Sequence, residues 1–210
     1  MKIIWHGHAC FEIVSKEGSA VFDPYAKGSV RGFELPPICA DAIISSHRHS
    51  DHCGAENVTL SGRAPNFSVR QIETWHDECM GEKRGKNLIT VIEAEGLRVA
   101  HCGDLGHELS EAQLRELGQI DIMMIPVGGY YTVDALTAKA VAAAVSPTVV
   151  IPMHYRCGDK GLKSIAGCDE FTKLFPKDLV RRLDTNECTL CKPLTPSVTV
   201  FALPDKIADS

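Results

Sequence analysis

The chain has no long apolar run, no internal repeat and no low-complexity tract. Its first apolar stretch, residues 1–11, contains His6 and His8, which the core of a secretory signal or a membrane-spanning helix would not normally tolerate. We therefore expect a cytoplasmic protein without a membrane partner. A length of 210 residues is long for one compact domain but short for two, and we expect a single domain over residues 1–210.

An excess of positive charge is also missing. The 22 Lys and Arg residues against 27 Asp and Glu residues give a net charge of -5, and the cations are scattered apart from short runs at 83–84 and 181–182. Proteins that track a nucleic-acid backbone usually carry a basic groove. The composition therefore predicts no nucleic-acid partner and favours a small-molecule substrate, while it leaves open whether the chain forms a homo-oligomer.

A complete set of disulfides is excluded, because the chain has nine cysteines, an odd number. Reduced thiols, most of them small buried apolar residues, are the expectation for a cytoplasmic chain. Cys188 and Cys191 form a CxxC pair, but a structural zinc site needs four ligands and no second CxxC or well-spaced histidine pair accompanies it. A thiol-redox protein is therefore only an alternative, and no βαβ pattern lies next to the pair.

The hydrophobic pattern predicts an α/β fold. Alternating residues and turn signals predict an antiparallel sheet near the start, and a buried run over residues 42–45 follows a Pro-rich loop. The later half alternates strands with helices, and a capping box at Ser110 opens one helix that Gly118 ends. The expected elements are strands at 2–5, 11–14, 20–23, 88–93, 97–100, 120–126 and 149–153, and helices at 110–118 and 133–145. Together they predict two sheets covered by helices.

The densest group of metal-binding residue types follows the buried run. The segment Ser46-His-Arg-His-Ser-Asp-His52 places four such residues within six positions: His47, His49, Asp51 and His52. In extended backbone, residues two apart point the same way, so His47 and His49 can hold one ion while the turn directs Asp51 and His52 toward another. Imidazole and carboxylate suit zinc, iron or manganese, whereas calcium prefers oxygen ligands alone. A solvated polar loop is the alternative interpretation.

The HxHxDH spacing resembles the hallmark of the metallo-β-lactamase superfamily, in which a lone His, an Asp and a final His follow. Residues of these types occur here in that order: His76, Asp104 and His154, with Asp23 in Phe22-Asp-Pro24 matching the first, largely structural motif. The chain is most similar to small bacterial metal-dependent hydrolases related to the ascorbate-lactonase-like branch, through Gly7-His-Ala-Cys-Phe11 and Pro126-Val-Gly-Gly129. The resemblance covers roughly residues 1–156 and implies a four-layer αββα sandwich with the site at one edge between the sheets.

The resemblance also implies the roles of individual residues. His47, His49 and His76 would hold a first metal ion, and Asp104 would bridge it to a second ion. The second ion would be held by Asp51, His52 and His154. Two divalent transition-metal ions are therefore expected, zinc foremost, with manganese or iron as alternatives.

A hydroxide bridging the two ions would attack the substrate, with Asp51 or Asp104 orienting it. His8, His107 or Tyr130 would protonate the leaving group. His8 is alternatively a donor to a metal-binding residue or a core histidine satisfied by backbone, and His107 is alternatively an ordinary loop residue. His6 and His101 are expected to be packing residues.

Hydrolysis is favoured over redox chemistry, because superfamily members that reduce oxygen at a di-iron centre usually carry Glu where this chain has His49. Small esters, lactones and phosphodiesters are the expected substrates, and the resemblance does not imply β-lactam cleavage. The second hypothesis is a non-catalytic metal-binding or metal-sensing module. Such a module would have no open coordination position, and the intact Asp104 argues against it.

Overall fold

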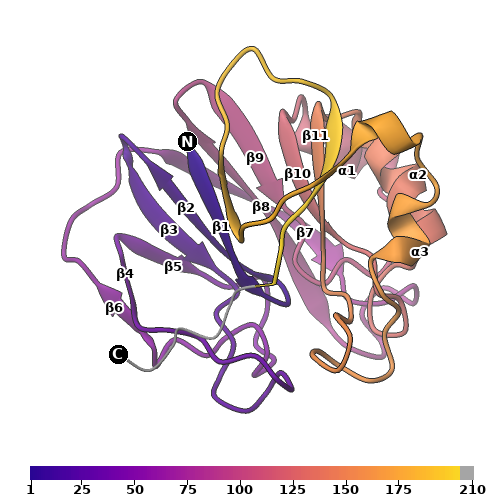
Figure 1. Ribbon diagram of the computed structural model, residues 1–210, viewed down its shortest axis with the longest axis horizontal. Helices are drawn as coiled ribbons and strands as arrows, with labels where there is room; N and C mark the ends of the chain where they lie inside the picture. Colours follow the sequence, from indigo (N-terminus) through magenta and orange to yellow (C-terminus); the bar gives the residue numbers. More distant parts are fainter. Residues whose placement is uncertain (204–210) are drawn as a thin grey trace.

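Two β-sheets packed face to face make up most of the computed structural model, which describes residues 1–203 (Figure 1). The five-stranded sheet has the order β13-β1-β2-β3-β5. Its strands are β1 (Lys2–Gly7), β2 (Cys10–Ser15), β3 (Gly18–Phe22), β5 (Ala42–Ile44) and β13 (Glu187–Thr189). β1, β2 and β3 pair antiparallel, and β5 runs parallel to β3 with Ile44 opposite Phe22. That register brings Asp23 next to the segment that follows β5.

The second sheet has seven strands in the order β12-β14-β11-β10-β9-β8-β7. They are β7 (Ser68–Trp75), β8 (Lys86–Ala94), β9 (Leu97–His101), β10 (Ile122–Pro126), β11 (Val149–Met153), β12 (Val180–Arg182) and β14 (Ser197–Val200). β7, β8 and β9 pair antiparallel, whereas β9, β10, β11, β14 and β12 are parallel. The carboxyl ends of β7, β9, β10 and β11 therefore meet at one edge of this sheet.

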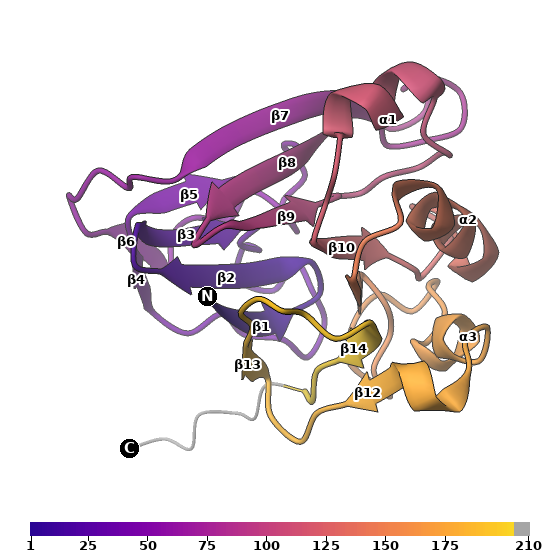
Figure 2. The ribbon, with the colours of Figure 1, turned by 90° about the horizontal axis from the view of Figure 1, so that it is seen from above.

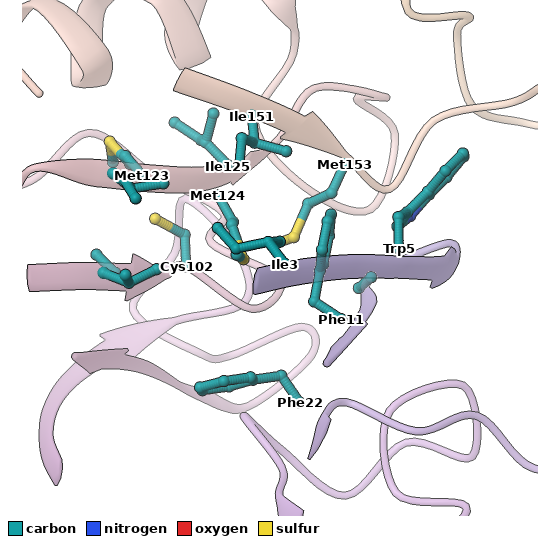
Figure 3. Close-up of a cluster of buried hydrophobic side chains, with 14 of the residues drawn as sticks. Ile3, Trp5, Phe11, Phe22, Cys102, Met123, Met124, Ile125, Ile151 and Met153 are labelled. Atoms are coloured by element: carbon teal, nitrogen blue, oxygen red, sulfur yellow. The ribbon is translucent and has the colours of Figure 1, made fainter. Parts of the chain in front are cut away.

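The core lies between the two sheets. Figure 3 shows Met124 and Met153, from β10 and β11, directed toward Ile3 and Phe11, from β1 and β2. All four side chains are fully buried. Burial of each such side chain contributes about 1.5–3 kcal/mol, so this contact fixes how the two sheets face each other.

The helices lie outside the seven-stranded sheet (Figure 2). They are α1 (Glu111–Leu117), α2 (Ala135–Val145) and α3 (Asp169–Thr172), followed by a 3₁₀ turn at Lys177–Leu179. Within residues 1–203 no helix covers the outer face of the five-stranded sheet, beside which β4 (Ile38–Ala40) and β6 (Val58–Leu60) form a small parallel pair. No helix in this part of the chain is both long and apolar enough to cross a membrane.

The predicted sandwich of two sheets is confirmed, and so are most of its predicted elements. Ser110 caps α1 with the expected capping box, in which its side chain accepts from the backbone of Gln113. The helix predicted over residues 133–145 begins at Ala135, because Asp134 is its N-cap and accepts from Thr137 N. All nine cysteines are free thiols, as expected, but only Cys10, Cys102 and Cys168 are buried, so the expectation that most of them are buried is wrong.

Candidate metal centre

The candidate site is built from segments that follow strand ends. His8 comes directly after β1, the HxHxDH segment follows β5, His76 follows β7, Asp104 follows β9 and His154 follows β11. Within each sheet these strands run in the same direction, so their carboxyl ends meet at one edge. Residues that directly follow a strand are positioned by the rigid sheet, but their side chains do not have to pack in its core. The topology thus gathers residues spread over nearly 150 positions of the chain.

Potential ligand atoms gather in three overlapping groups, each within 4.8 Å. The three histidines that the resemblance assigns to the first ion, His47, His49 and His76, form one group. Asp51, His52 and His154, assigned to the second ion, form another, and His8 joins them. The third group consists of His47, His52 and Asp104.

Asp104 lies between the two histidine groups. Its Oδ2 atom is 3.2 Å from His76 Nε2 on one side, and 3.2 Å and 3.3 Å from the Nε2 atoms of His52 and His154 on the other. Burial by itself would raise the pKa of the Asp104 carboxyl, but the imidazoles of His154 and His52 outweigh it and hold the pKa well below its usual range. Asp104 is therefore an ionised, buried carboxylate that lies between the two histidine groups.

Several polar atoms of the cluster lack a hydrogen-bond partner although they are buried. Among the described residues they include Nε2 of His47, His52 and His154, both ring nitrogens of His8, and Oδ1 of Asp104. Leaving a polar atom buried and unpaired costs about 1–3 kcal/mol. Coordination of a metal ion removes that cost for imidazole nitrogens and carboxylate oxygens alike. The residues present therefore fit a transition-metal centre.

The charges of the cluster also fit a transition-metal centre. Burial lowers the pKa of His8 to about 4 and of His47 to about 3, so both imidazoles are neutral at pH 7 and able to donate a lone pair to a metal. Burial also disfavours charge on His52, yet the carboxylates of Asp104 and Asp23 raise its pKa well above the usual value. The buried carboxylates thus require positive charge at this place, which bound cations would supply.

Asp23 orients His52 and the start of the HxHxDH loop. Its Oδ2 accepts from Nδ1 of His52 at 2.7 Å, and its Oδ1 accepts from Ser46 N at 2.6 Å. Because Nδ1 of His52 donates its hydrogen to this carboxylate, Nε2 is the ring nitrogen that faces the cluster. This arrangement fits the structural role that the resemblance implied for Asp23.

Ser46 fixes which ring nitrogen of His47 carries the proton. Its hydroxyl donates to Asp23 Oδ2 at 2.7 Å, and its oxygen lies 2.9 Å from His47 Nδ1. A hydroxyl has one proton, so the serine that donates to Asp23 must accept from His47. The proton of His47 is thereby held on Nδ1 and its Nε2 is left free for a metal.

Asn87 positions Asp104, and no sequence signal marked it. Its Oδ1 accepts from Asp104 N at 2.9 Å, and its Nδ2 donates to Thr74 Oγ1 at 2.8 Å and to Cys102 O at 2.9 Å. Gly103 makes this close approach possible: it has a φ of +54°, and a Cβ atom there would lie 2.4 Å from both Asn87 Oδ1 and Ser46 Cβ. The segment between β9 and Asp104 therefore needs glycine.

Asp77 shapes the loop that follows His76, and it too was missed. Its carboxylate accepts from four backbone N–H groups at 2.8–3.1 Å, those of Cys79, Gly81, Lys83 and Arg84. His76 N in turn donates to Gly85 O at 3.0 Å, which closes the base of the loop. These hydrogen bonds hold the loop in one conformation and so fix the position of His76 at the end of β7.

The structure does not bring His107 into the cluster. Its Nδ1 donates to Glu108 O at 2.7 Å and its Nε2 accepts from Trp75 N at 3.0 Å, so both ring nitrogens are engaged. His107 therefore supports the end of β7, one residue before His76. Tyr130, the other loop residue considered as a proton donor, is 68% exposed.

The two histidines predicted to be packing residues are both buried. His6 pairs with Glu12 at 3.0 Å. His101 stacks on Phe22, donates from Nε2 to Ala9 O at 2.8 Å and accepts at Nδ1 from Gly103 N at 3.2 Å. It therefore ties the strand before Asp104 to the segment that carries His8.

The CxxC pair lies apart from the centre. Cys188 is in β13, and in the described part of the chain neither it nor Cys191 joins a group able to hold a metal. Burial raises the pKa of the Cys188 thiol to about 11, which keeps it protonated and unreactive at neutral pH.

Comparison with known proteins identifies the class. Residues 2–154 match the family model described as "Beta-lactamase superfamily domain", a span that runs from β1 to His154 and contains every residue of the cluster. The chain belongs to this superfamily. Within it, the chain belongs to the UPF0173 metal-dependent hydrolases: it is 30% identical over 208 residues to such a protein of Thermoplasma acidophilum, covering 80% of this chain and 91% of the relative.

Two further matches agree. The UPF0173 metal-dependent hydrolase of Archaeoglobus fulgidus is 29% identical over 196 residues, covering 74% of this chain and 83% of the relative. The crystal structure of a Thermotoga maritima protein, described as a "putative zn-dependent hydrolase of the metallo-beta-lactamase superfamily", matches with a TM-score of 0.74 and 34% sequence identity. The match covers 95% of this chain and 97% of the Thermotoga chain. The predictions of family, fold and metal-dependent hydrolysis are thereby confirmed.

Proposed function

We propose that this metal-dependent hydrolase uses two transition-metal ions, zinc foremost, to cleave a small ester, lactone or phosphodiester. The observation that carries the proposal is the position of Asp104, whose Oδ2 atom lies 3.2–3.3 Å from Nε2 atoms of both histidine groups. A carboxylate in that position suits a bridge between two ions. His47, His49 and His76 would hold the first ion, and Asp51, His52 and His154 the second.

When bound, the ions would lower the pKa of a water toward about 7 and polarise the scissile carbonyl or phosphoryl group. The protein contributes orientation and charge. Asp23 and Ser46 keep protons on the Nδ1 atoms of His52 and His47, so that the opposite nitrogens face inward. Asp104, buried and ionised, balances the positive charge of the centre and accepts hydrogen bonds from a nucleophile held beside it.

Access to the centre is one-sided. His49 is exposed and the Asp51 side chain is 21% exposed, whereas the side chains of His52, His154 and Asp104 are buried. A substrate therefore approaches past His49 and Asp51. Asp51 is the carboxylate that such a substrate meets first, and it is placed to orient the attacking water.

The test is the metal content of protein purified without a histidine tag or added metal, measured by plasma mass spectrometry beside a His49→Ala variant. We expect about two ions per native chain and clearly fewer in the variant. Turnover of bis(p-nitrophenyl) phosphate, p-nitrophenyl esters and simple lactones is then measured with and without a chelator. Activity that the chelator abolishes and metal restores supports the proposal.

Two results would contradict it. Protein that binds no ion even after reconstitution with zinc, manganese and iron would refute the dinuclear centre. Protein that binds two ions but is inert toward every substrate class in the panel would instead favour the metal-binding or sensing module.

A further inference from the structure

His8 has an uncommon backbone conformation that the surrounding structure holds in place. Its φ is +52°, in the left-handed region that non-glycine residues rarely occupy. Its carbonyl oxygen accepts from Trp5 Nε1 at 3.0 Å and from His154 N at 3.2 Å. The preceding Gly7 has a φ of +103° and lies so close to Phe33 that a Cβ atom would be 2.3 Å from the ring. Strain of this kind persists where neighbouring structure enforces it, and it often marks a functional position.

Packing does not account for the imidazole of His8. The side chain is fully buried, yet neither ring nitrogen has a hydrogen-bond partner among the described residues. Buried histidines that serve only the core normally have at least one such partner. Asp51 Oδ2 lies 3.4 Å from His8 Nε2, beyond the usual range for a hydrogen bond.

The separation of these atoms is instead that of ligands sharing one ion. Donor atoms bound to the same ion at about 2.0–2.1 Å lie about 3–4 Å from one another. His8 Nε2 is 3.4 Å from Asp51 Oδ2, and His52 Nε2 is 3.7 Å from the same oxygen. The rings of His8 and His154 lie with centroids 4.0 Å apart, and one ligand atom from each of the four residues falls within the same 4.8 Å group.

We propose that His8 is a fourth protein ligand of the second metal ion, beside Asp51, His52 and His154, an inference that rests on the dinuclear centre proposed above. With the bridging Asp104, the second ion is then enclosed by protein. The first ion has only three histidines and Asp104, and one of those histidines, His49, is exposed. Because the first ion has one protein ligand fewer than the second and its ligand His49 is exposed, the exchangeable position that takes substrate belongs to the first ion.

The experiment compares metal binding of the wild type with two variants of His8. His8→Gln keeps a polar side chain of similar length, and His8→Asn suits the left-handed backbone. Apoprotein is titrated with Zn²⁺ in competition with a chromophoric chelator, and Co²⁺ binding is followed by its visible absorption. His6→Gln is the matched control, because His6 lies two residues before His8, in β1, but pairs with Glu12 outside the cluster. Circular dichroism checks that each variant is folded.

We expect the wild type and His6→Gln to bind two ions, and both His8 variants to retain the first while binding the second at least about 100-fold more weakly. The Co²⁺ absorption of the second site should change as well, which a loss of turnover alone would not produce. Unchanged affinities at both sites, or equal weakening of both, would overturn the assignment of His8 as a ligand. Wild-type protein that binds fewer than two ions would refute the dinuclear centre itself.

Discussion

The carboxylate of Asp23 accepts a hydrogen bond from Nδ1 of His52 at 2.7 Å. Both side chains are buried, and the register of β3 beside β5 places them together although they are 29 positions apart. The hydrogen bond turns the Nε2 atom of His52 toward Asp104, 3.2 Å away. Asp23, which directly follows β3, thus determines which ring nitrogen of His52 is free to bind a metal.

Replacing Asp23 with Asn tests this control. We expect metal affinity at the second site to fall about 10–100-fold, because an uncharged amide accepts more weakly from His52 Nδ1 than a carboxylate does and so strengthens the Nε2 lone pair less. Chelator-competition titration of the purified variant measures the effect. Asp41→Asn is the matched control, since Asp41 is also a buried, hydrogen-bonded carboxylate but accepts from Ser19 N and Arg63 away from the cluster. An affinity equal to wild type would show that Asp23 serves only the fold.

Removal of metal should destabilise the protein. The cluster leaves imidazole nitrogens and Asp104 Oδ1 buried without hydrogen-bond partners, a cost that a bound ion relieves. A ligand present at about 1,000 times its dissociation constant adds about 4 kcal/mol, or roughly 10 °C in melting temperature for a chain of this size. Thermal unfolding with and without EDTA measures the shift. The His49→Ala variant should show a smaller shift, and equal melting temperatures for both forms of the wild type would contradict the prediction.

The parts of this site that could be predicted from the sequence depend on residues that lie close together in the chain. The HxHxDH spacing and the capping box at Ser110 involve residues within a few positions, and both predictions describe the structure well. His76, Asp104 and His154 are far apart in sequence, so their grouping depended on the family resemblance. The strand at Ser68–Trp75 was not predicted, because its exposed and buried residues do not alternate cleanly.

The residues that support the candidate ligands could not be predicted from the sequence pattern. Asn87 and Asp77 act through hydrogen bonds to backbone groups whose positions depend on the folded loops. His8 and His107 were both candidate proton donors, each with other interpretations open, and the tertiary structure separates them. His8 lies in the cluster with both nitrogens free, whereas His107 is hydrogen-bonded outside it.

Acid should remove the contribution of Asp41 to stability. Hydrogen bonds from Ser61, Ser19 N and Arg63 lower the pKa of its carboxyl from 3.8 to about 2. A folded-state pKa below the unfolded one means that the stabilisation is fully present above pH 3.8 and is lost as the pH falls toward 2. Urea unfolding of metal-free wild type and Asp41→Asn should therefore differ at pH 7 and converge between pH 4 and 2. A difference that does not depend on pH would show that the ionised carboxylate is not the cause.

Gly103→Ala should damage both the fold and the centre. Gly103 and Gly96 both have positive φ, +54° and +70°, so alanine at either costs about 1–2 kcal/mol of backbone strain. A Cβ atom at Gly96 meets no atom within 4 Å, whereas at Gly103 it lies 2.4 Å from Asn87 Oδ1 and Ser46 Cβ. Relief of that overlap must shift Asn87, which holds Asp104, or Ser46, which holds His47.

The two alanine variants therefore form a matched pair. We expect urea unfolding to show that Gly103→Ala loses at least about 2 kcal/mol more than Gly96→Ala, a typical cost of inserting a methyl group into a packed site. Zn²⁺ titration should show weakened binding only for Gly103→Ala, because only there does the added methyl press on residues that orient the ligands. Equal losses of stability together with wild-type metal affinity in both variants would mean that the segment before Asp104 tolerates a side chain, and that Asn87 does not determine where the bridging carboxylate sits.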